Sequence, residues 1–493
     1  MVMSMSQTSR KEEGMPYRID RQVVLGLILL IAIAFRFYDL RSIPPGFFVD
    51  EAMEGNQALE ALSTGHLRVF YSENEGREGM FVWLATVPLR LFGNQPWALR
   101  SVSATVGVLT VLGLFCLGTL AFSDKVGAVA GFLLATSFWH TNFSRIGMRA
   151  ILAPLFVVWM LYFFFRGVRY QRLWNFAVAG LLLGLGFYTY LSFRVAPAIL
   201  LTAVIACRRR TELNGLKPLV VMVLIAVIAV VPLAAHFVGH PEDLMRRASE
   251  VVIWSGYDLV TNVMKTVGMF NYAGDRNIRH NLRRVEGNPG EERIEGEPML
   301  PFAVGALLLV GIGSIHLRNW SSADMATLGW LGFGLLCVVL SDAAPHAGRG
   351  LIVVPAVYIA AANGLALISD SLKSRFRREW LVAAEIGLLA VTMAIEGNKY
   401  FVRWSRQPNL AGNFFELDVR IGTILNRVPM GRSIYVYVTP HRLANVDGIP
   451  VNAQTLMFIT DTYTREKQHQ KNIRYSMAPP VDVSPDTLVV KLP

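Results

Sequence analysis

The chain alternates between long apolar runs and short polar connections over most of its 493 residues. We interpret eleven runs as transmembrane helices, since a helix needs roughly 20 predominantly apolar residues to cross a bilayer. They are residues 22–39, 98–122, 126–141, 150–168, 174–191, 194–207, 217–238, 299–316, 325–341, 349–368 and 380–396. The pattern predicts an all-α polytopic membrane protein with about eleven transmembrane helices.

Lysine and arginine are concentrated in alternate connections, as expected when cytoplasmic loops retain positive charge. If the N-terminus is cytoplasmic, the inner connections include Lys125, Arg166, Arg169 and Arg172, and the cluster Arg208–Arg210. A further apolar stretch, residues 79–93, would reverse this bias if it crossed the membrane. We therefore expect it outside, lying on or dipping into the membrane as an interfacial helix, and expect a multi-pass protein of the plasma (inner) membrane.

This topology places two long loops and the C-terminal region outside. The loops are residues 40–97 and 239–298. The C-terminal region lacks the long apolar runs of the preceding chain. It has a helix-like stretch at 413–426 and strand-like runs between turn residues. The strand-like runs are residues 433–438, 456–460 and 487–492. We expect three parts: a cytoplasmic tail 1–21, a transmembrane domain 22–396, and a small extracytoplasmic α/β domain 397–493.

Composition agrees with a membrane setting. Mean hydropathy is +0.40, and only 17% of residues are charged, below the quarter usual in soluble domains. The formal net charge of +11 follows the inner connections, so it does not indicate a nucleic-acid partner. The three cysteines, Cys116, Cys207 and Cys337, lie inside apolar runs and form neither a metal motif nor a disulfide framework.

Adjacent carboxylates, Asp50 and Glu51, follow the first apolar run. Residues 51–62 have a helical pattern with an apolar and a polar side, which is typical of a helix in the membrane interface. One interpretation is structural: Asp50 caps this helix and Glu51 complements its dipole. The other is catalytic: Asp50 accepts the proton of an acceptor hydroxyl as that hydroxyl attacks a sugar carbon, and Glu51 orients the acceptor.

Several arginines depart from the charge bias by lying at outer ends of the predicted spans. A guanidinium group binds phosphate through two parallel hydrogen bonds, so together they predict a site for a lipid phosphate. The alternative is that they reach ordinary headgroups or pair with acids such as Asp342. The predicted phosphate ligands are Arg145, Arg149, Arg194 and Arg349, with His346.

Other polar residues of the outer side are candidates for substrate contact. Residues 271–282 are dense in hydrogen-bonding side chains that suit a sugar or pyrophosphate, although solvated loops are often polar without a catalytic role. Acidic residues around Arg77 suit either an acceptor rim or a surface salt-bridge cluster. The candidate substrate residues are Tyr190, Glu78, Asp275, Arg279 and His280.

No phosphate-binding P-loop, dinucleotide glycine motif or zinc-protease motif is found. The short motifs of this chain instead resemble those of the GT-C membrane glycosyltransferases, specifically bacterial relatives of the protein O-mannosyltransferases and of the lipid A aminoarabinose transferase (glycosyltransferase family 39). The resemblance covers roughly residues 20–400. It consists of Val49-Asp50-Glu51, Glu78-Gly79-Met80-Phe81, Phe92-Gly93 leading to Ala98-Leu99-Arg100, Ser144-Arg145 and the turn from Tyr188 to Arg194.

The resemblance implies an enzyme that uses a polyprenyl-phosphate-linked sugar, inverts at the anomeric carbon and works on the extracytoplasmic face. Carried over, Asp50 is the base and Glu51 its acceptor-binding neighbour. Metal requirement varies in the family, so a divalent metal stays open as an alternative, but no Asp-x-Asp motif is found here and the sequence supports no firm prediction of a metal or cofactor. Arg77-Glu78-Gly79-Met80 replaces the His-Pro-Pro-Leu common in better-known members.

We therefore expect a glycosyltransferase whose partners are a polyprenyl-phosphate sugar, membrane lipids and a protein, lipid or glycan acceptor. A transporter or flippase of lipid-linked sugars is one alternative, and it predicts charged residues at mid-span. Arg36 and Glu385 are the main charged residues inside predicted spans. A non-catalytic membrane scaffold is the other alternative, and it predicts no need for Asp50.

Overall fold

A computed structural model describes residues 20–73, 76–244, 256–286, 293–314, 320–429, 431–438, 451–480 and 484–492. All eleven predicted spans contain a helix. These helices are α1 (Arg21–Phe37), α4 (Pro96–Ala121), α5 (Asp124–Thr136), α7 (Leu152–Tyr170), α8 (Leu173–Gly186), α9 (Ala196–Arg209), α10 (Lys217–Gly239), α13 (Phe302–Ser314), α14 (Ser322–Val339), α15 (Val354–Leu372) and α16 (Arg378–Asn398). Of the predicted cytoplasmic tail, residues 1–19 lie outside the described residues.

Seven helices in the described part of the chain are long and apolar enough to cross a membrane. They are α4, α7, α9, α10, α14, α15 and α16, counted with the short helical turns that adjoin some of them: η1 (Arg149–Ile151), η2 (Leu191–Val195), η4 (Arg349–Val353) and the π-helical η5 (Lys399–Trp404). The predicted fold class, a polytopic α-helical membrane protein with a small α/β part, is confirmed.

One predicted span is interrupted. We expected a single helix over 126–141, but α5 ends at Thr136 and α6 (Phe138–Arg145) begins after Ser137, which caps it by accepting from the His140 backbone N–H. The buried Arg36 side chain donates to the carbonyls of Leu134 and Ala135 at 3.1 and 2.9 Å. A cation bound to the carbonyl end of a helix is favourable because those oxygens have no partner inside the helix. Arg36 therefore stabilises the break.

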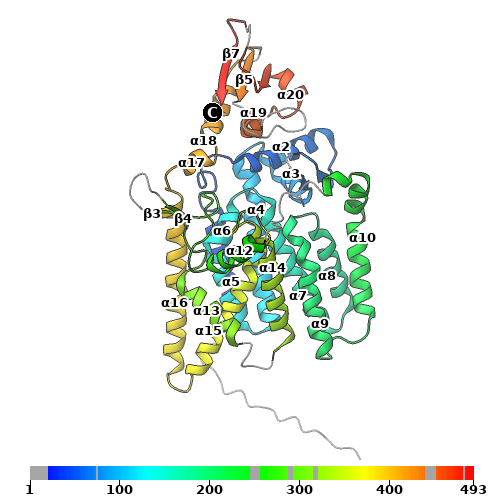
Figure 1. Cartoon of the computed structure of the whole chain (residues 1–493), viewed down its shortest axis with the longest axis vertical. Helices are drawn as coiled ribbons and strands as arrows, with labels where there is room; N and C mark the ends of the chain where they lie inside the picture. Colours follow the sequence, from blue (N-terminus) through cyan, green and yellow to red (C-terminus); the bar gives the residue numbers. More distant parts are fainter. Residues whose placement is uncertain are drawn as a thin grey trace, which may run out of the picture.

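Two helices lie across the end of the bundle, between it and the C-terminal domain (Figure 1). These are α2 (Val49–Thr64) and α3 (Met80–Phe92), joined by a small hairpin of β1 (Phe70–Tyr71) and β2 (Arg77–Glu78). The expected helix after Asp50 is thus present, and residues 79–93 form a helix of their own that packs on α2 and α4.

A second connection lies near the same end of the bundle. It contains α12 (Gly256–Gly268) and an antiparallel hairpin of β3 (Arg283–Glu286) and β4 (Arg293–Gly296). A β-bridge between Gly274 and Gly296 ties the preceding loop to this hairpin. The loop of residues 271–282 is therefore held to a folded hairpin on one side.

The C-terminal domain is a three-stranded parallel sheet in the order β6-β5-β7 with helices beside it. Residues 456–460, expected as a strand, are helical and buried, and a strand at 473–476 was not expected. A short apolar run does not distinguish a buried strand from a buried helix. The elements are α17 (Leu410–Asn413), α18 (Glu416–Leu425), β5 (Ile434–Val438), η6 (Val451–Ala453), α19 (Gln454–Thr460), α20 (Arg465–Gln470), β6 (Ile473–Ser476) and β7 (Leu488–Leu492).

Candidate active site

The first turn of α2 is fixed by Glu51, which is fully buried. Its carboxylate accepts from Nε and a terminal nitrogen of Arg100 at 2.8 and 3.0 Å. It also accepts from the backbone N–H groups of Gly147 at 2.7 Å and Phe48 at 3.1 Å. Such paired hydrogen bonds to a buried carboxylate are strong and geometrically specific. Our expectation that Glu51 contacts an acceptor does not fit this geometry, because both oxygens are bound inside the protein.

Asp50 points the other way and keeps 35% of its side chain exposed. Arg77 on β2 donates from one nitrogen to the Asp50 carboxylate and from the other to its backbone oxygen, both at 3.1 Å. The helix begins at Val49 with Phe48 as its N-cap, so Asp50 is the second helical residue and does not cap the helix. The structural interpretation that it acts as the cap is therefore wrong.

One turn further along α2, Glu54 holds Arg149. The Arg149 guanidinium lies 2.7 Å from a Glu54 oxygen and 3.5 Å from Glu78 on β2, and it packs on the Tyr190 ring. Burial raises the pKa of Glu54, against the lowering effect of Arg149. Glu78, expected as a substrate residue, is itself buried. It lies behind Arg149 and acts on that cation rather than on the pocket.

The loop of residues 275–281 is organised around Asp275. Its carboxylate accepts from the backbone N–H groups of Asn277 at 2.7 Å and Ala347 at 2.8 Å, and it lies 2.9 Å from Nδ1 of His280. Burial acts to raise the Asp275 pKa, but His280 and the hydrogen bonds outweigh it, and the pKa is about 2. Asp275 therefore stays ionised and joins two connections of the chain.

Asp275, His280 and His346 could together hold a metal ion, because one ligand atom from each lies within 4.8 Å of the others. Burial lowers the His346 pKa to about 4, which leaves its imidazole neutral as a metal ligand must be. Both Asp275 oxygens are already engaged by His280 and backbone N–H groups. A cation would have to replace the contact between Asp275 and His280.

Arg279 is a half-buried cation of this loop. Its guanidinium stacks on the Phe48 ring, 3.8 Å from the centroid, and its Nε is buried without a hydrogen-bond partner. Burial lowers the Arg279 pKa, with Asp50 opposing that effect. A buried polar atom without a partner is costly, so an anion that accepted from this nitrogen would remove that cost.

These side chains surround a small pocket of about 210 Å³. Its lining includes Asp50 and Arg77, the cations Arg149 and Arg279, and the ring of Tyr190. The remaining lining residues are Phe48, Phe143, Met148, Ala150, Asn277, His280, His346 and Gly348. We call this the Asp50 pocket. It brings together one partly exposed carboxylate and a set of positive or hydrogen-bonding groups.

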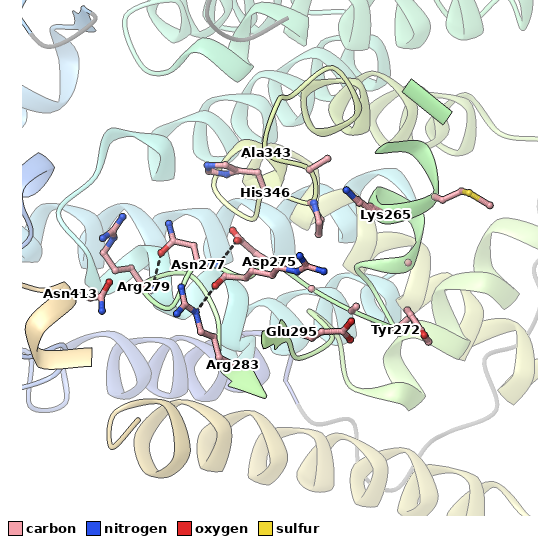
Figure 2. A pocket seen from close by; sticks show the side chains of 17 residues that line it. Lys265, Tyr272, Asp275, Asn277, Arg279, Arg283, Glu295, Ala343, His346 and Asn413 are labelled. Atoms are coloured by element: carbon pink, nitrogen blue, oxygen red, sulfur yellow. Dashed lines mark hydrogen bonds between the residues drawn. The ribbon is translucent and has the colours of Figure 1, made fainter. Parts of the chain in front are cut away.

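A larger cavity of about 840 Å³ adjoins it (Figure 2). Asn277, Arg279 and His346 line both spaces. The larger cavity also contains Arg276 and Lys265, and its walls come from α12, the 271–283 loop, the 343–346 loop and Asn413. We call it the α12 cavity. The two spaces share a polar wall centred on Arg279.

Three predicted phosphate ligands lie elsewhere. Arg145 is fully buried and donates to the carbonyls of Phe35 and Ile43 and to the Tyr400 hydroxyl. Arg349 binds Ser341 and, at 2.8 Å, Asp342, as the alternative interpretation expected. Arg194 is exposed on η2. None of the three lines the Asp50 pocket.

The roles of Arg77, Arg100 and Glu54 were not predicted from the sequence. A signal was present, because acidic residues 50, 51 and 54 fall on successive turns of one helix and buried acids need cationic partners. The partners come from β2, α4 and η1, and their distance in sequence hid the pairing.

Comparisons with known proteins give the same fold. A family model described as dolichyl-phosphate-mannose-protein mannosyltransferase matches residues 79–236. The structure of ArnT from Cupriavidus metallidurans bound to undecaprenyl phosphate is similar, with a TM-score of 0.59 and 14% identity, over 89% of this chain and 84% of that one. No curated protein matches significantly by sequence.

The archaeal oligosaccharyltransferase AglB from Archaeoglobus fulgidus, in complex with an inhibitory peptide and a dolichol-phosphate, has a TM-score of 0.53 and 14% identity. The match covers 89% of this chain and 63% of the archaeal chain. The structure of the same oligosaccharyltransferase tethered to an acceptor peptide has a TM-score of 0.53 and 15% identity to this chain. The described helices, the family match and these structures together show that the chain has the fold of the GT-C membrane glycosyltransferases.

Proposed function

We propose that the protein is an inverting membrane glycosyltransferase that moves a hexose or pentose from a polyprenyl-phosphate donor to an acceptor hydroxyl. The observation that carries this proposal is the Asp50 pocket, where a partly exposed carboxylate faces Arg149 and Arg279. A base for a hydroxyl and cations for a phosphate are the two groups that such a transfer requires. The similar structures with undecaprenyl phosphate and dolichol-phosphate support a lipid-linked donor.

In the proposed reaction, Asp50 accepts the proton of the acceptor hydroxyl. The oxygen of that hydroxyl at the same time forms a bond to the anomeric carbon of the sugar. The bond from that carbon to the phosphate oxygen breaks, and its electron pair stays with the lipid phosphate. Attack from the side opposite the leaving phosphate inverts the anomeric carbon. Arg77 orients the Asp50 carboxylate, and Arg149 and Arg279 stabilise the charge of the departing phosphate.

Glu51 and Glu78 have positioning roles in this proposal. Glu51 fixes the start of α2 through Arg100, and Glu78 holds Arg149. The 271–282 loop supplies Arg279 and, through Asp275 and His280, its fixed shape. The α12 cavity is the space for the donor headgroup, and its lining combines apolar residues of α12 with the basic side chains of the loop.

The charged residues that would suit a transporter are used structurally. Arg36 binds backbone carbonyls at the break between α5 and α6. Glu385 binds Lys125 and Ser369. Neither residue lines the Asp50 pocket or the α12 cavity. These contacts favour a fixed helix bundle over the transport alternative. The lysine and arginine bias of the inner connections assigns the first outer loop, which carries Asp50, to the outside. We therefore place the Asp50 pocket on the extracytoplasmic face.

Asp50→Asn tests the proposal directly. Asparagine keeps the size and one oxygen for Arg77 but cannot take a proton at neutral pH, so transfer should fall by roughly 100-fold or more. The measurement is release of undecaprenyl phosphate from a panel of undecaprenyl-phosphate-linked hexoses and pentoses, in membranes that contain the native acceptors. Asp342→Asn, which removes a carboxylate paired with Arg349, is the matched control and should keep normal activity.

Thermal unfolding separates loss of chemistry from loss of fold. Asp50→Asn should keep the fold with a lowered unfolding temperature, because the asparagine oxygen still accepts from Arg77 while the buried Arg77 cation loses its counter-charge. An Asp50→Asn protein with full transfer activity would rule out Asp50 as the base and would mean that the chemistry lies elsewhere.

A further inference from the structure

A second polar cavity lies at the opposite end of the helix bundle. It has a volume of about 570 Å³ and lies among the ends of α1, α4, α5 and α7. α7 follows the turn at Arg149 in the Asp50 pocket and ends at Tyr170, which lines the second cavity. At 1.5 Å per residue this helix separates the two sites by about 30 Å. We call this space the basic end pocket.

The charged side chains that line the basic end pocket are mostly positive. Arg21, Arg166 and Arg169 contribute three guanidinium groups, whereas Asp124 contributes one carboxylate. Asp124 lies 3.6 Å from Arg21, in an exposed pair, and such pairs contribute little. The positive charge of the other two arginines is therefore not neutralised by this carboxylate.

The described contacts of the two arginines on α7 are with neutral groups. Arg166 donates to the Tyr162 hydroxyl at 3.3 Å and stacks on the Tyr162 and Trp174 rings. Arg169 donates from one nitrogen to the Leu120 carbonyl at 3.1 Å. These contacts hold both guanidinium groups on the α7 side of the basic end pocket. A planar guanidinium group can donate two parallel hydrogen bonds to phosphate oxygens.

The rest of the lining offers hydroxyl groups. Tyr162 and Tyr170 add phenols, and Ser123 and Thr119 add aliphatic hydroxyls. The Thr119 Oγ1 is buried without a hydrogen-bond partner. Ser123 already accepts from the Val126 backbone N–H and Tyr162 from Arg166, so a hydroxyl-bearing headgroup would supply a partner that Thr119 lacks. Trp174 is 46% exposed beside Arg166, and tryptophan at this level is typical of the boundary between headgroups and acyl chains.

We propose that the basic end pocket binds the phosphate of an anionic phospholipid, with Arg166 and Arg169 as its ligands and the hydroxyl side chains facing the headgroup. Basic pockets between transmembrane helices are a known chemical solution for anionic headgroups. The site is independent of the proposed sugar transfer, and lipid bound there ties together four helices. A ligand that binds the folded state stabilises it by a free energy that rises with the logarithm of one plus the ratio of its concentration to its dissociation constant.

The test measures thermal unfolding of the purified full chain in a neutral detergent. Phosphatidylglycerol should raise the unfolding temperature as its concentration increases, whereas phosphatidylcholine and inorganic phosphate should not. The double variant Arg166→Gln/Arg169→Gln should lose this rise. Arg172→Gln/Arg209→Gln removes the same charge from exposed residues outside the pocket lining and should retain it.

A milder variant guards against misfolding. Arg169 is exposed, so Arg169→Gln should fold normally, and losing one charged hydrogen bond should raise the phosphatidylglycerol concentration needed for a given rise in unfolding temperature roughly tenfold. Equal stabilisation of both double variants would overturn the proposal, because it would show a general effect of surface charge. Concentration-dependent stabilisation by inorganic phosphate without any by phosphatidylglycerol would also overturn it.

Discussion

At the scale of single residues, the buried arginines fall into two groups. Arg36, Arg100 and Arg145 direct their guanidinium groups at carbonyls or at Glu51 and hold the fold together. Arg77 and Arg149, with the half-buried Arg279, line the Asp50 pocket. Arginine is suited to both roles because its planar group donates five hydrogen bonds and stays charged when buried. Position at a helix end therefore does not reveal which role an arginine has.

Arg279→Gln should weaken donor binding without loss of fold. Its guanidinium group stacks on Phe48 and has an unpartnered nitrogen, so losing a charged hydrogen bond should raise the donor KM by roughly 10-fold to 100-fold. Steady-state rates of lipid phosphate release at varied donor concentration measure this. Arg194→Gln, on the exposed η2, is the control. Equal donor KM values in the two variants would exclude Arg279 as a phosphate ligand.

The sequence predicted Asp50, Arg149 and Arg279 as candidates, and these lie together. It did not separate them from Arg145 and Glu51, because burial depends on partners far away in the chain. Glu51 meets Arg100, and Arg145 meets Tyr400. A local pattern in a single sequence does not show which distant residues pair. An exposed charge at a helix end therefore cannot be distinguished from a charge in a buried ion pair.

At the scale of elements, the C-terminal domain holds the helix that carries Asp50. The buried helix α19 packs across α2, with Phe458 against Phe47 and against the backbone at Gly55. Asn56 donates to the backbone and side-chain oxygens of Gln454 at 3.0 and 2.8 Å. Hydropathy predicted the helices of the bundle well, but residues 456–460 of α19 were predicted as a strand, since a run of four apolar residues and a threonine has no clear period.

Gly55→Ala should lower both stability and transfer. A Cβ atom at this position would lie 2.5 Å from the Phe458 ring, and overpacking of this kind usually costs about 1–3 kcal/mol. The displaced α19 would shift the first turns of α2 and so Asp50. Thermal unfolding and transfer rate measure the two effects together.

Gly412→Ala is the matched control, because a Cβ atom there meets nothing within 4 Å. A Gly55→Ala protein as stable and active as this control would show that the contact between α2 and α19 does not position Asp50.

At the scale of the whole molecule, the bundle has two polar ends that differ in kind. One carries α2, α3 and the C-terminal domain (Figure 1), with the Asp50 pocket and the α12 cavity. The other carries the basic end pocket. The charge bias of the sequence predicts that the first end is outside and the second is cytoplasmic. Arg10, Lys11, Arg18 and Arg318, which contribute to that bias, lie outside the described residues.

Cysteine labelling tests this orientation. Ser63→Cys on α2 and Ser476→Cys in the C-terminal domain should react with an impermeant maleimide in intact cells. Ser371→Cys, exposed at the end of α15, should react only after the membrane is opened. The native cysteines are buried or half-buried, so the parent chain gives the background. Protection of both outer positions would reverse the orientation.

The shared wall of the two cavities has a consequence for how the enzyme would respond to its substrates. Asn277, Arg279 and His346 face both spaces, so a molecule in one space sets the geometry and charge that the other presents. Thermodynamic linkage then requires that donor and acceptor change each other's affinity by the same factor. The concentration of one substrate that saturates the enzyme would depend on the concentration of the other. The cellular concentration of lipid-linked sugar would therefore change the apparent affinity for the acceptor.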